Sequence, residues 1–278
     1  MTTRRPSHPR PPSSGSVLAA AALLAVVAVL MPGAAPTIRA AEDDLRLSAD
    51  ATYRVVPADG EVRVRVDWKA TNLQPNTVRR TPSGILTTRY FYDRLLFTVP
   101  IEAREIRATS GGGRLSVSTR DLEFSRQVTV RIPNLYYRQS RSMRVDFVLP
   151  GGKPRSDSDV RVGRAFTTFT AWAWGDANRG AVRIILPSGF DAEGYGDDVT
   201  QRTYDDRVEL TSGRIADPLD WYRVVVADRP TQLTQVDVDT GGRKIVVRAW
   251  PEDVTWRERV SDVLTDGLPE LEKMIGRP

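Results

Sequence analysis

Hydrophobic and charged residues alternate along most of the chain, most regularly at residues 61–68. This segment reads Glu-Val-Arg-Val-Arg-Val-Asp-Trp, so an extended strand would have four apolar side chains on one face and charged ones on the other. Such a pattern predicts an antiparallel strand with one face in water. The turn residues Asp59 and Gly60 precede it and tolerate positive φ angles, which predicts a hairpin with a strand at residues 45–56.

Short strand-like segments separated by Pro, Gly and Asn clusters continue as far as residue 250. They lie at residues 87–99, 105–109, 114–118, 122–132, 142–149, 160–174, 181–186, 207–211, 221–227, 235–238 and 244–250. The composition shifts after Gly151-Gly152-Lys153-Pro154, which predicts a domain boundary near residue 155. We therefore expect a mainly β chain with two antiparallel β-sandwich-like domains, at residues 41–155 and 156–250.

The final segment, residues 251–278, changes to the period of an amphipathic helix. Its apolar stripe consists of Trp256, Val260, Val263, Leu264, Leu271 and Met274. Gly267 and Pro269 predict a kink or a break into two short helices, and Gly276 predicts the end of the helix.

The first 40 residues have the layout of a secretory signal peptide. Arginines precede an apolar run at residues 17–31, and small residues follow it up to Ala40. Because this run is shorter than a membrane-spanning helix, we expect cleavage near Ala40 and a secreted or extracytoplasmic cell-surface location. Contact with a membrane is expected only if the leader stays uncleaved.

Charge and composition exclude several functions. Cleavage would remove four arginines and no acid, so the formal net charge would fall from +5 to +1, without a basic cluster that would predict nucleic-acid binding. The sequence has no Cys, and its only His is His8. Cysteine nucleophiles, Ser-His-Asp triads and His- or Cys-ligated zinc are therefore excluded from the mature chain. We assign no catalytic, cofactor-binding or metal-binding residue and expect this chain alone not to be an enzyme.

Residues 244–251, Lys-Ile-Val-Val-Arg-Ala-Trp-Pro, together with 256–278, resemble the N-terminal part of bacterial gluzincin-type, thermolysin-like metallopeptidases. The second range contains Leu-Pro-Glu-Leu-Glu at 268–272 and Ile-Gly-Arg-Pro at 275–278. The resemblance implies a β-rich region followed by a helical catalytic domain with an H-E-x-x-H zinc motif, which a chain with one histidine cannot contain. It thus implies a non-catalytic scaffold or accessory region that ends before the catalytic domain. The expected interface with that domain is Trp256, Val260, Leu264 and Leu271.

The alternative interpretation is a complete cell-surface module that binds an extracellular protein, peptide or glycan. Its candidate contact surface comprises the aromatic residues Trp172, Trp174, Tyr137 and Tyr222. Against this, apolar residues on both faces of residues 166–174 favour a strand buried on both sides. The two interpretations differ in whether the apolar stripe of the C-terminal helix is covered by the chain's own sheets or exposed.

Overall fold

The computed structural model describes residues 44–240 and 242–276, and the predicted leader lies outside them. The chain is mainly β with one C-terminal helix, as predicted. The elements in chain order are β1 (Leu45–Val56), β2 (Glu61–Asn72), β3 (Thr77–Thr81), β4 (Gly84–Thr88), β5 (Phe91–Pro100), β6 (Arg104–Ser110), β7 (Gly113–Leu115), β8 (Val117–Asp121), β9 (Ser125–Tyr136), β10 (Ser140–Pro150), β11 (Arg161–Val162), β12 (Phe166–Trp172), β13 (Gly180–Pro187), β14 (Asp191–Gly196), β15 (Thr200–Thr203), β16 (Arg207–Thr211), β17 (Tyr222–Asp228), the short 3-10 helix η2 (Pro230–Gln232), β18 (Thr234–Thr240), β19 (Arg243–Ala249) and α1 (Val254–Ile275). Within the described residues, no helix combines the length and apolar character needed to cross a membrane.

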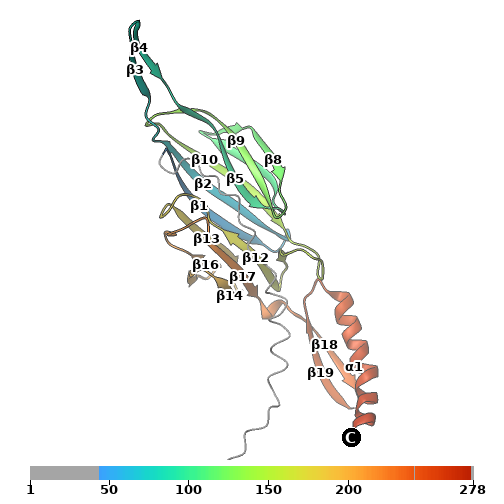
Figure 1. Ribbon diagram of the computed structural model, residues 1–278. Coiled ribbons are helices and arrows are strands. Elements are labelled where there is room, and N and C mark those ends of the chain that lie inside the picture. Colours follow the sequence, from blue (N-terminus) through green and yellow to red (C-terminus); the bar gives the residue numbers. More distant parts are fainter. Residues whose placement is uncertain (1–43, 241, 277–278) are drawn as a thin grey trace, which may run out of the picture. The chain divides into compact units, whose positions relative to one another are not determined.

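The largest sheet has eight strands in the order β15-β16-β13-β1-β2-β10-β6-β7 (Figure 1). Near its centre, β1 and β2 form the predicted hairpin, from Leu45 opposite Asn72 to Val56 opposite Glu61. Gly60 in the turn has a φ of +66°, a left-handed conformation that glycine adopts without strain. The local sequence therefore specifies both strands and their pairing.

Two smaller sheets cover the apolar face of this large sheet. The three-stranded sheet β5-β9-β8 contacts it through Phe97, whose ring centre lies 5.2 Å from that of Trp68 in β2. The four-stranded sheet β11-β12-β17-β14 contacts it through Phe169, which stacks on Tyr53 in β1 at 5.9 Å. Buried residues of all three sheets form one hydrophobic cluster. The large sheet is thus one layer of a β-sandwich, and both smaller sheets contribute to the other layer.

The outer face of the large sheet carries the charged half of the alternating pattern. Arg65 pairs with Asp146 and Arg144 with Asp67, each at 2.8 Å between directly opposed residues of β2 and β10. These pairs are about half exposed, so they contribute little to stability. Because side chains alternate along a strand, these charged residues lie on the outer face and the apolar residues of the same strands lie on the face toward the core.

The boundary predicted near residue 155 falls in the loop between β10 and β11. The large sheet continues across this loop, because β1 pairs with β13 from Ala49 opposite Gly180 to Arg54 opposite Ile185. This pair is parallel, whereas the sequence predicts antiparallel neighbours only. Parallel neighbours cannot be joined by a tight turn, and the chain from β2 to β12 forms the long connection between them.

Three strands, β3, β14 and β15, lie in segments where the hydrophobic pattern predicts none. β14 pairs with β17, and β15 pairs with β16, each at the edge of its sheet. β3 pairs with β4, and the two form a separate hairpin. These strands have no buried residue, so they lack the apolar alternation by which a strand is recognised.

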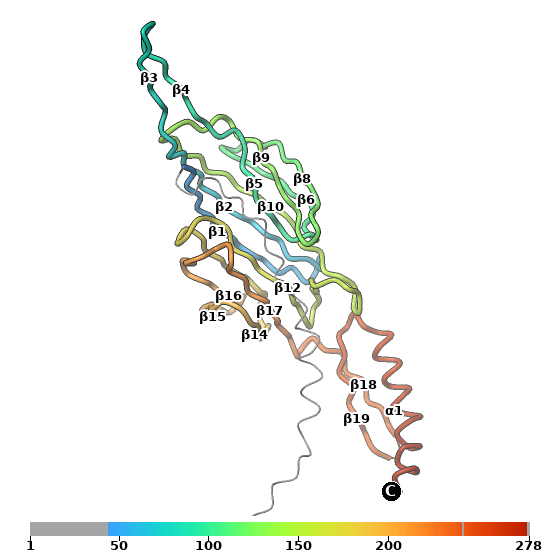
Figure 2. The backbone as a smooth tube through the Cα atoms, viewed as in Figure 1, coloured from blue at the N-terminus to red at the C-terminus, as the bar shows by residue number. Residues whose placement is uncertain are grey.

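The C-terminal helix α1 is a single helix of 22 residues, and the predicted break into two short helices is wrong. α1 runs through Pro269, which removes one backbone hydrogen bond but leaves the neighbouring turns in place. The helix packs along the two-stranded sheet β18-β19 (Figures 1 and 2), where Arg243 forms a 2.6 Å ion pair with Glu272. It ends as predicted at Gly276, whose φ is +67°.

Candidate functional site

The four aromatic residues of the predicted contact surface do not lie together. Trp172 and Tyr222 are directly opposed in the β12–β17 ladder, where Trp172 is half-buried and Tyr222 is exposed. Tyr137 is in the turn between β9 and β10, which belong to other sheets. Trp174 is buried and does not reach the surface.

Trp174 has a structural role in the core. Its Nε1 donates a 2.8 Å hydrogen bond to the carbonyl oxygen of Thr98 in β5, and its ring lies edge-on to Phe147 in β10 at 6.2 Å. The strand before it has one fully buried face, at Thr167, Phe169 and Ala171, while the other face is half-buried. Burial on both sides, as predicted for this strand, is therefore correct for one face only.

Helix α1 carries apolar residues that the described structure does not cover. Trp256, Val260 and Leu264 are half-buried, and Leu271 is 51% exposed. None of the residues of α1 is fully buried. Helical spacing places Val263 and Met274, which are 62% and 83% exposed, on the same side as Trp256, Val260 and Leu271. We call these five residues the exposed α1 stripe.

A shallow hollow of about 310 Å³ lies along the first half of this stripe. Trp256, Val260, Val263 and Leu264 line it on the helix, together with the guanidinium-bearing side chains of Arg155 and Arg259. Arg155 also forms a 3.2 Å ion pair with Asp253, the residue before α1. The hollow thus combines an apolar floor with a positively charged rim.

The start of α1 is joined to the four-stranded sheet by specific contacts. Trp250 stacks on Phe166 of β12 with ring centres 4.7 Å apart. The carboxylate of Glu252 accepts a 2.8 Å hydrogen bond from the backbone N–H of Arg164. These contacts join the segment between β19 and α1 to the edge of the four-stranded sheet.

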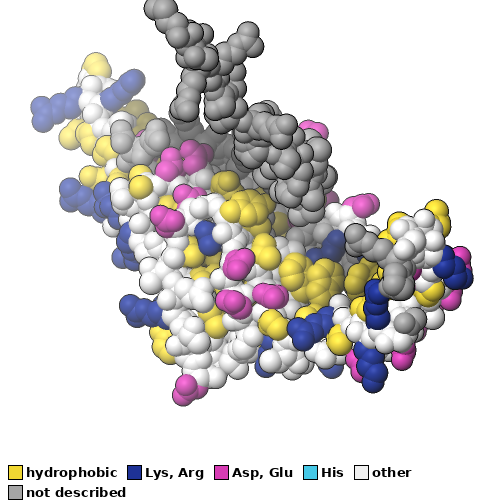
Figure 3. All heavy atoms as spheres, turned by 90° about the horizontal axis from the view of Figure 1, so that it is seen from below, with side chains coloured by type: hydrophobic (Ala, Val, Ile, Leu, Met, Phe, Trp, Pro, Cys, Tyr) yellow, Lys and Arg dark blue, Asp and Glu magenta, His cyan; other side chains and the backbone are white. Residues whose placement is uncertain are grey.

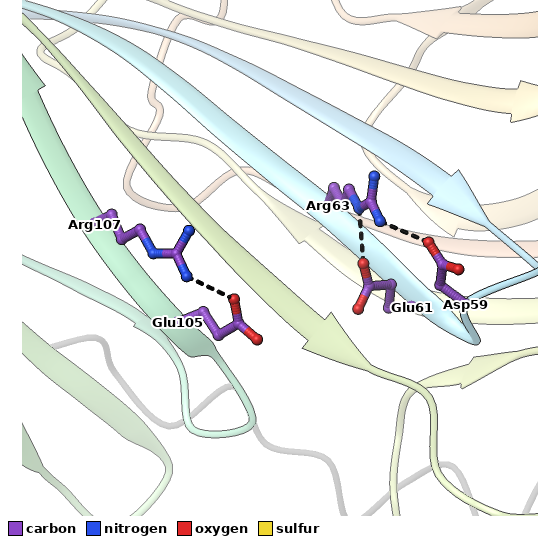
Figure 4. A network of polar contacts seen from close by, with 5 residues as sticks. All are labelled: Asp59, Glu61, Arg63, Glu105 and Arg107. Atoms are coloured by element: carbon purple, nitrogen blue, oxygen red, sulfur yellow. Dashed lines mark hydrogen bonds and ion pairs between the residues drawn. The ribbon is translucent and has the colours of Figure 1, made fainter.

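A second hollow, of about 660 Å³, lies beside β6, β7 and β8 and is rich in arginine. Arg104, Arg107, Arg114 and Arg126 line it together with Glu105. Arg107 donates to Glu105 at 3.1 Å. Figure 4 shows this pair together with Arg63 of β2, which donates to the carboxylates of Glu61 and Asp59.

Ion pairs with arginine lower the pKa of two carboxyl groups, those of Asp121 and Asp93. A hydrogen bond from Arg126 to Asp121 at 2.5 Å lowers the pKa of that carboxyl group. In the same way Arg94 lowers the pKa of Asp93. Both carboxylates are thus stabilised in their charged form, the opposite of what a general acid needs. Burial in the core strongly raises the pKa of Tyr53, which is no general acid for a site at the surface.

The donor set does not fit the zinc site of a gluzincin. The described residues include no histidine, and among them no three carboxylates gather closely enough to hold a metal ion. A zinc site of this class needs two imidazoles on one helix face. In the view of Figure 3, charged side chains of both signs are interspersed with hydrophobic ones, so the visible face has no single sign of charge.

No family model matches the sequence, and no curated protein matches it significantly. Among solved structures, the chain is similar to an M1 zinc metallopeptidase from Deinococcus radiodurans, with 15% identity, a TM-score of 0.39, and coverage of 74% of this chain and 47% of that chain. A mutant of the same enzyme bound to a Tyr-Ser-Ala substrate gives 16% identity, a TM-score of 0.40, and coverage of 77% and 52%. The chain spans about half the length of these enzymes.

Proposed function

We propose that this chain is the non-catalytic, β-rich part of a secreted or cell-surface gluzincin-like metallopeptidase, and that α1 forms the surface on which a helical catalytic domain packs. The proposed family rests on the resemblance of residues 244–251 and 256–278 to the N-terminal part of these enzymes. Residues 44–240 and 242–276 contain no histidine, which the zinc motif of these enzymes requires. The role of the chain is to hold and orient the catalytic domain.

The exposed α1 stripe is the observation that carries this proposal. A helix of 22 residues with an apolar stripe ordinarily buries that stripe, yet no residue of α1 is fully buried. The side that packs on β18 and β19 is covered in part, whereas Val263, Leu271 and Met274 are more than half exposed. A contiguous apolar surface of this kind is typical of a protein-binding site.

The spacing of the stripe favours a helical partner. Trp256, Val260, Val263, Leu271 and Met274 follow steps of three, four and eight residues, which form a ridge along the helix. Such a ridge fits the groove between side chains of another helix at an interaxial distance of about 8–10 Å. Arg259 on the rim of the hollow would then pair with an acidic residue beside that groove, while Arg155 is already paired with Asp253.

A site-specific cross-linking experiment in the producing cells tests this proposal. A photoreactive amino acid replaces Leu271, which lies in the stripe, and in a matched control it replaces the exposed residue Asp262, on the polar side of α1. We expect Leu271 to cross-link to a segment of an H-E-x-x-H domain, in the same polypeptide or in a partner, and Asp262 to give little product. Mass spectrometry of the cross-linked peptides identifies the segment.

Three results would contradict the proposal. Equal yields from Leu271 and Asp262 would mean that the stripe has no preferred partner. A cross-link only to a second copy of this chain would assign the stripe to self-association instead. Zinc-dependent peptidase activity from this purified chain alone would show that the catalytic groups are here, contrary to the donor set.

A further inference from the structure

Strands β3 and β4 form a hairpin that has both faces in water. Every residue of both strands is exposed, and each strand pairs only with the other. Val78 is 62% exposed, Ile85 70% and Leu86 58%. Figures 1 and 2 show the hairpin extending past the ends of β2 and β5. An isolated two-stranded hairpin is marginally stable in water, so its exposed apolar residues indicate a contact surface.

Aromatic residues surround the base of this hairpin. Phe91 at the start of β5 and Tyr136 at the end of β9 are 48% and 38% exposed, with their ring centres 5.6 Å apart. In the following turn, the guanidinium of Arg138 lies over the ring of Tyr137 at 5.1 Å. We call residues 77–91 and 136–138 together the hairpin end.

The buried side chain of Asn72 joins the segment that leads into the hairpin to the end of β9. Its Nδ2 donates to the carbonyl oxygen of Leu135 and its Oδ1 accepts from the backbone N–H of Gln74, both at 2.8 Å. Its own carbonyl oxygen accepts from the backbone N–H of Arg138 at 2.8 Å. The segment that leads into the hairpin and the β9–β10 turn are therefore joined at the end of β2.

The positive charge of the hairpin end is uncompensated. Residues 68–92 include four basic residues and no acid. Arg79, Arg80, Arg89 and Arg138 form no ion pair with any residue in 44–240 or 242–276. Arg65 and Arg144 on the large sheet, by contrast, are each paired with a carboxylate. The missing negative charge at this end would have to come from a partner.

Apolar and basic side chains occur on both faces of the hairpin. Arg80 is directly opposite Ile85 on one face, and Arg79 is directly opposite Leu86 on the other. A partner that meets one face of the hairpin would leave the apolar side chains of the other face in water, whereas lipid at an interface can contact both faces. Near the tip the apolar and basic residues are level with each other, and the aromatic rings of Phe91 and Tyr136 lie at the base. Arginine side chains are long enough to reach lipid phosphates while their apolar neighbours lie deeper, and aromatic rings are typical of the headgroup level, so this arrangement fits the interface of a bilayer.

We propose that the hairpin end docks on a membrane surface that contains anionic phospholipids. Ile85 and Leu86 enter the boundary between headgroups and acyl chains, and Arg79 and Arg80 bind the lipid phosphates. Phe91 and Tyr136 lie at the headgroup level. This contact is independent of the leader and of α1.

The test uses the full chain, which has no cysteine, so that one introduced cysteine carries a polarity-sensitive fluorophore. The label is placed at Ser83→Cys in the hairpin turn and, as a control, at Gln201→Cys in the exposed edge strand β15. Because the apolar run at residues 17–31 could itself hold the chain on a vesicle, the readout is the emission of the label and not the binding of the chain. We expect a blue shift at Ser83→Cys on equimolar phosphatidylglycerol and phosphatidylcholine, none on phosphatidylcholine alone, and none at Gln201→Cys.

Charge-reversal variants then identify the groups responsible. Each arginine near an anionic surface strengthens binding about fivefold, so Arg79→Glu with Arg80→Glu should raise the lipid concentration at half-shift at least about 25-fold. Arg183→Glu with Arg202→Glu changes two exposed, unpaired arginines of the large sheet and should have little effect. The proposal would be overturned if the two double variants raised the lipid concentration at half-shift equally. It would also be overturned if the label at Ser83→Cys showed no blue shift on either kind of vesicle. A shift with polyglutamate but not with vesicles would assign the surface to an acidic protein.

Discussion

The hydroxyl of Tyr53 connects the two layers of the sandwich and predicts a measurable loss of stability in Tyr53→Phe. Tyr53 lies in β1 and is fully buried. Its hydroxyl donates to the carbonyl oxygen of Trp172 in β12 at 2.9 Å and accepts from the backbone N–H of the same residue at 2.8 Å. Burial raises the pKa of Tyr53 well above its ordinary value, so the hydroxyl stays protonated and can donate.

The expected loss follows from these two hydrogen bonds. Phenylalanine keeps the ring and its stacking on Phe169, so no large cavity forms. Each hydrogen bond contributes about 0.5–1.5 kcal/mol net, and a buried group left unpaired costs about 1–3 kcal/mol. Trp172 is half-buried rather than fully buried, so we expect a loss near the lower values. We expect about 2 kcal/mol.

Urea unfolding followed by circular dichroism and tryptophan fluorescence measures this loss. With an m value of about 2–3 kcal/mol per molar urea, the midpoint should fall by about 0.7–1 M. Tyr92→Phe is the matched control, because Tyr92 is half-buried and its hydroxyl has no hydrogen-bond partner in residues 44–240 and 242–276. It should change stability by less than about 0.5 kcal/mol. Equal midpoints for the two variants would refute the reasoning.

The form of the transition tests the domain organisation as well. The large sheet and the hydrophobic cluster combine strands from before and after residue 155. We therefore expect both probes to report one coincident transition for residues 44–250, in Tyr53→Phe as in the parent chain. Two separate transitions, only one of them shifted, would instead support independent folding of the predicted halves.

Three further predictions concern single contacts. Pro269→Ala should increase the helicity of α1 and slow amide exchange around residue 269. The substitution restores a backbone N–H inside the helix, where proline costs up to about 3 kcal/mol relative to alanine. Unchanged exchange would contradict this. Trp174→Phe should lower the free energy of unfolding by about 1–3 kcal/mol, since the carbonyl of Thr98 loses its donor; a loss no larger than that of Tyr92→Phe would refute it. Arg126 lowers the pKa of Asp121, so the charged carboxylate stabilises the fold above about pH 4, and this stabilisation is lost as the pH falls through the folded pKa. The difference in unfolding free energy between the parent and Asp121→Asn should therefore disappear in acid. A difference that stays constant would argue against the pair.

Local patterns determined much of the fold from the sequence alone. The alternation at residues 61–68 and the Asp59-Gly60 turn specify the β1–β2 hairpin, because the residues that decide it are neighbours in the chain. The change to a 3.6-residue period likewise specifies α1, and Gly276 specifies its end. The absence of histidine after His8 excludes a zinc site of the gluzincin class without reference to any structure.

Tertiary structure alone decided which segments meet. The alternation of apolar and polar residues shows which face of a strand is buried but not which strand lies next to it. The parallel pairing of β1 with β13 could therefore not be predicted from the sequence. The same limit applies to Trp174, whose burial depends on Phe147 and Thr98 in distant strands. The β3–β4 hairpin was missed for another reason: it buries nothing, and burial is what produces a hydrophobic period. Likewise, the sequence predicts the stripe on α1, but only the packing of the helix on β18 and β19 decides which of its apolar residues stay exposed.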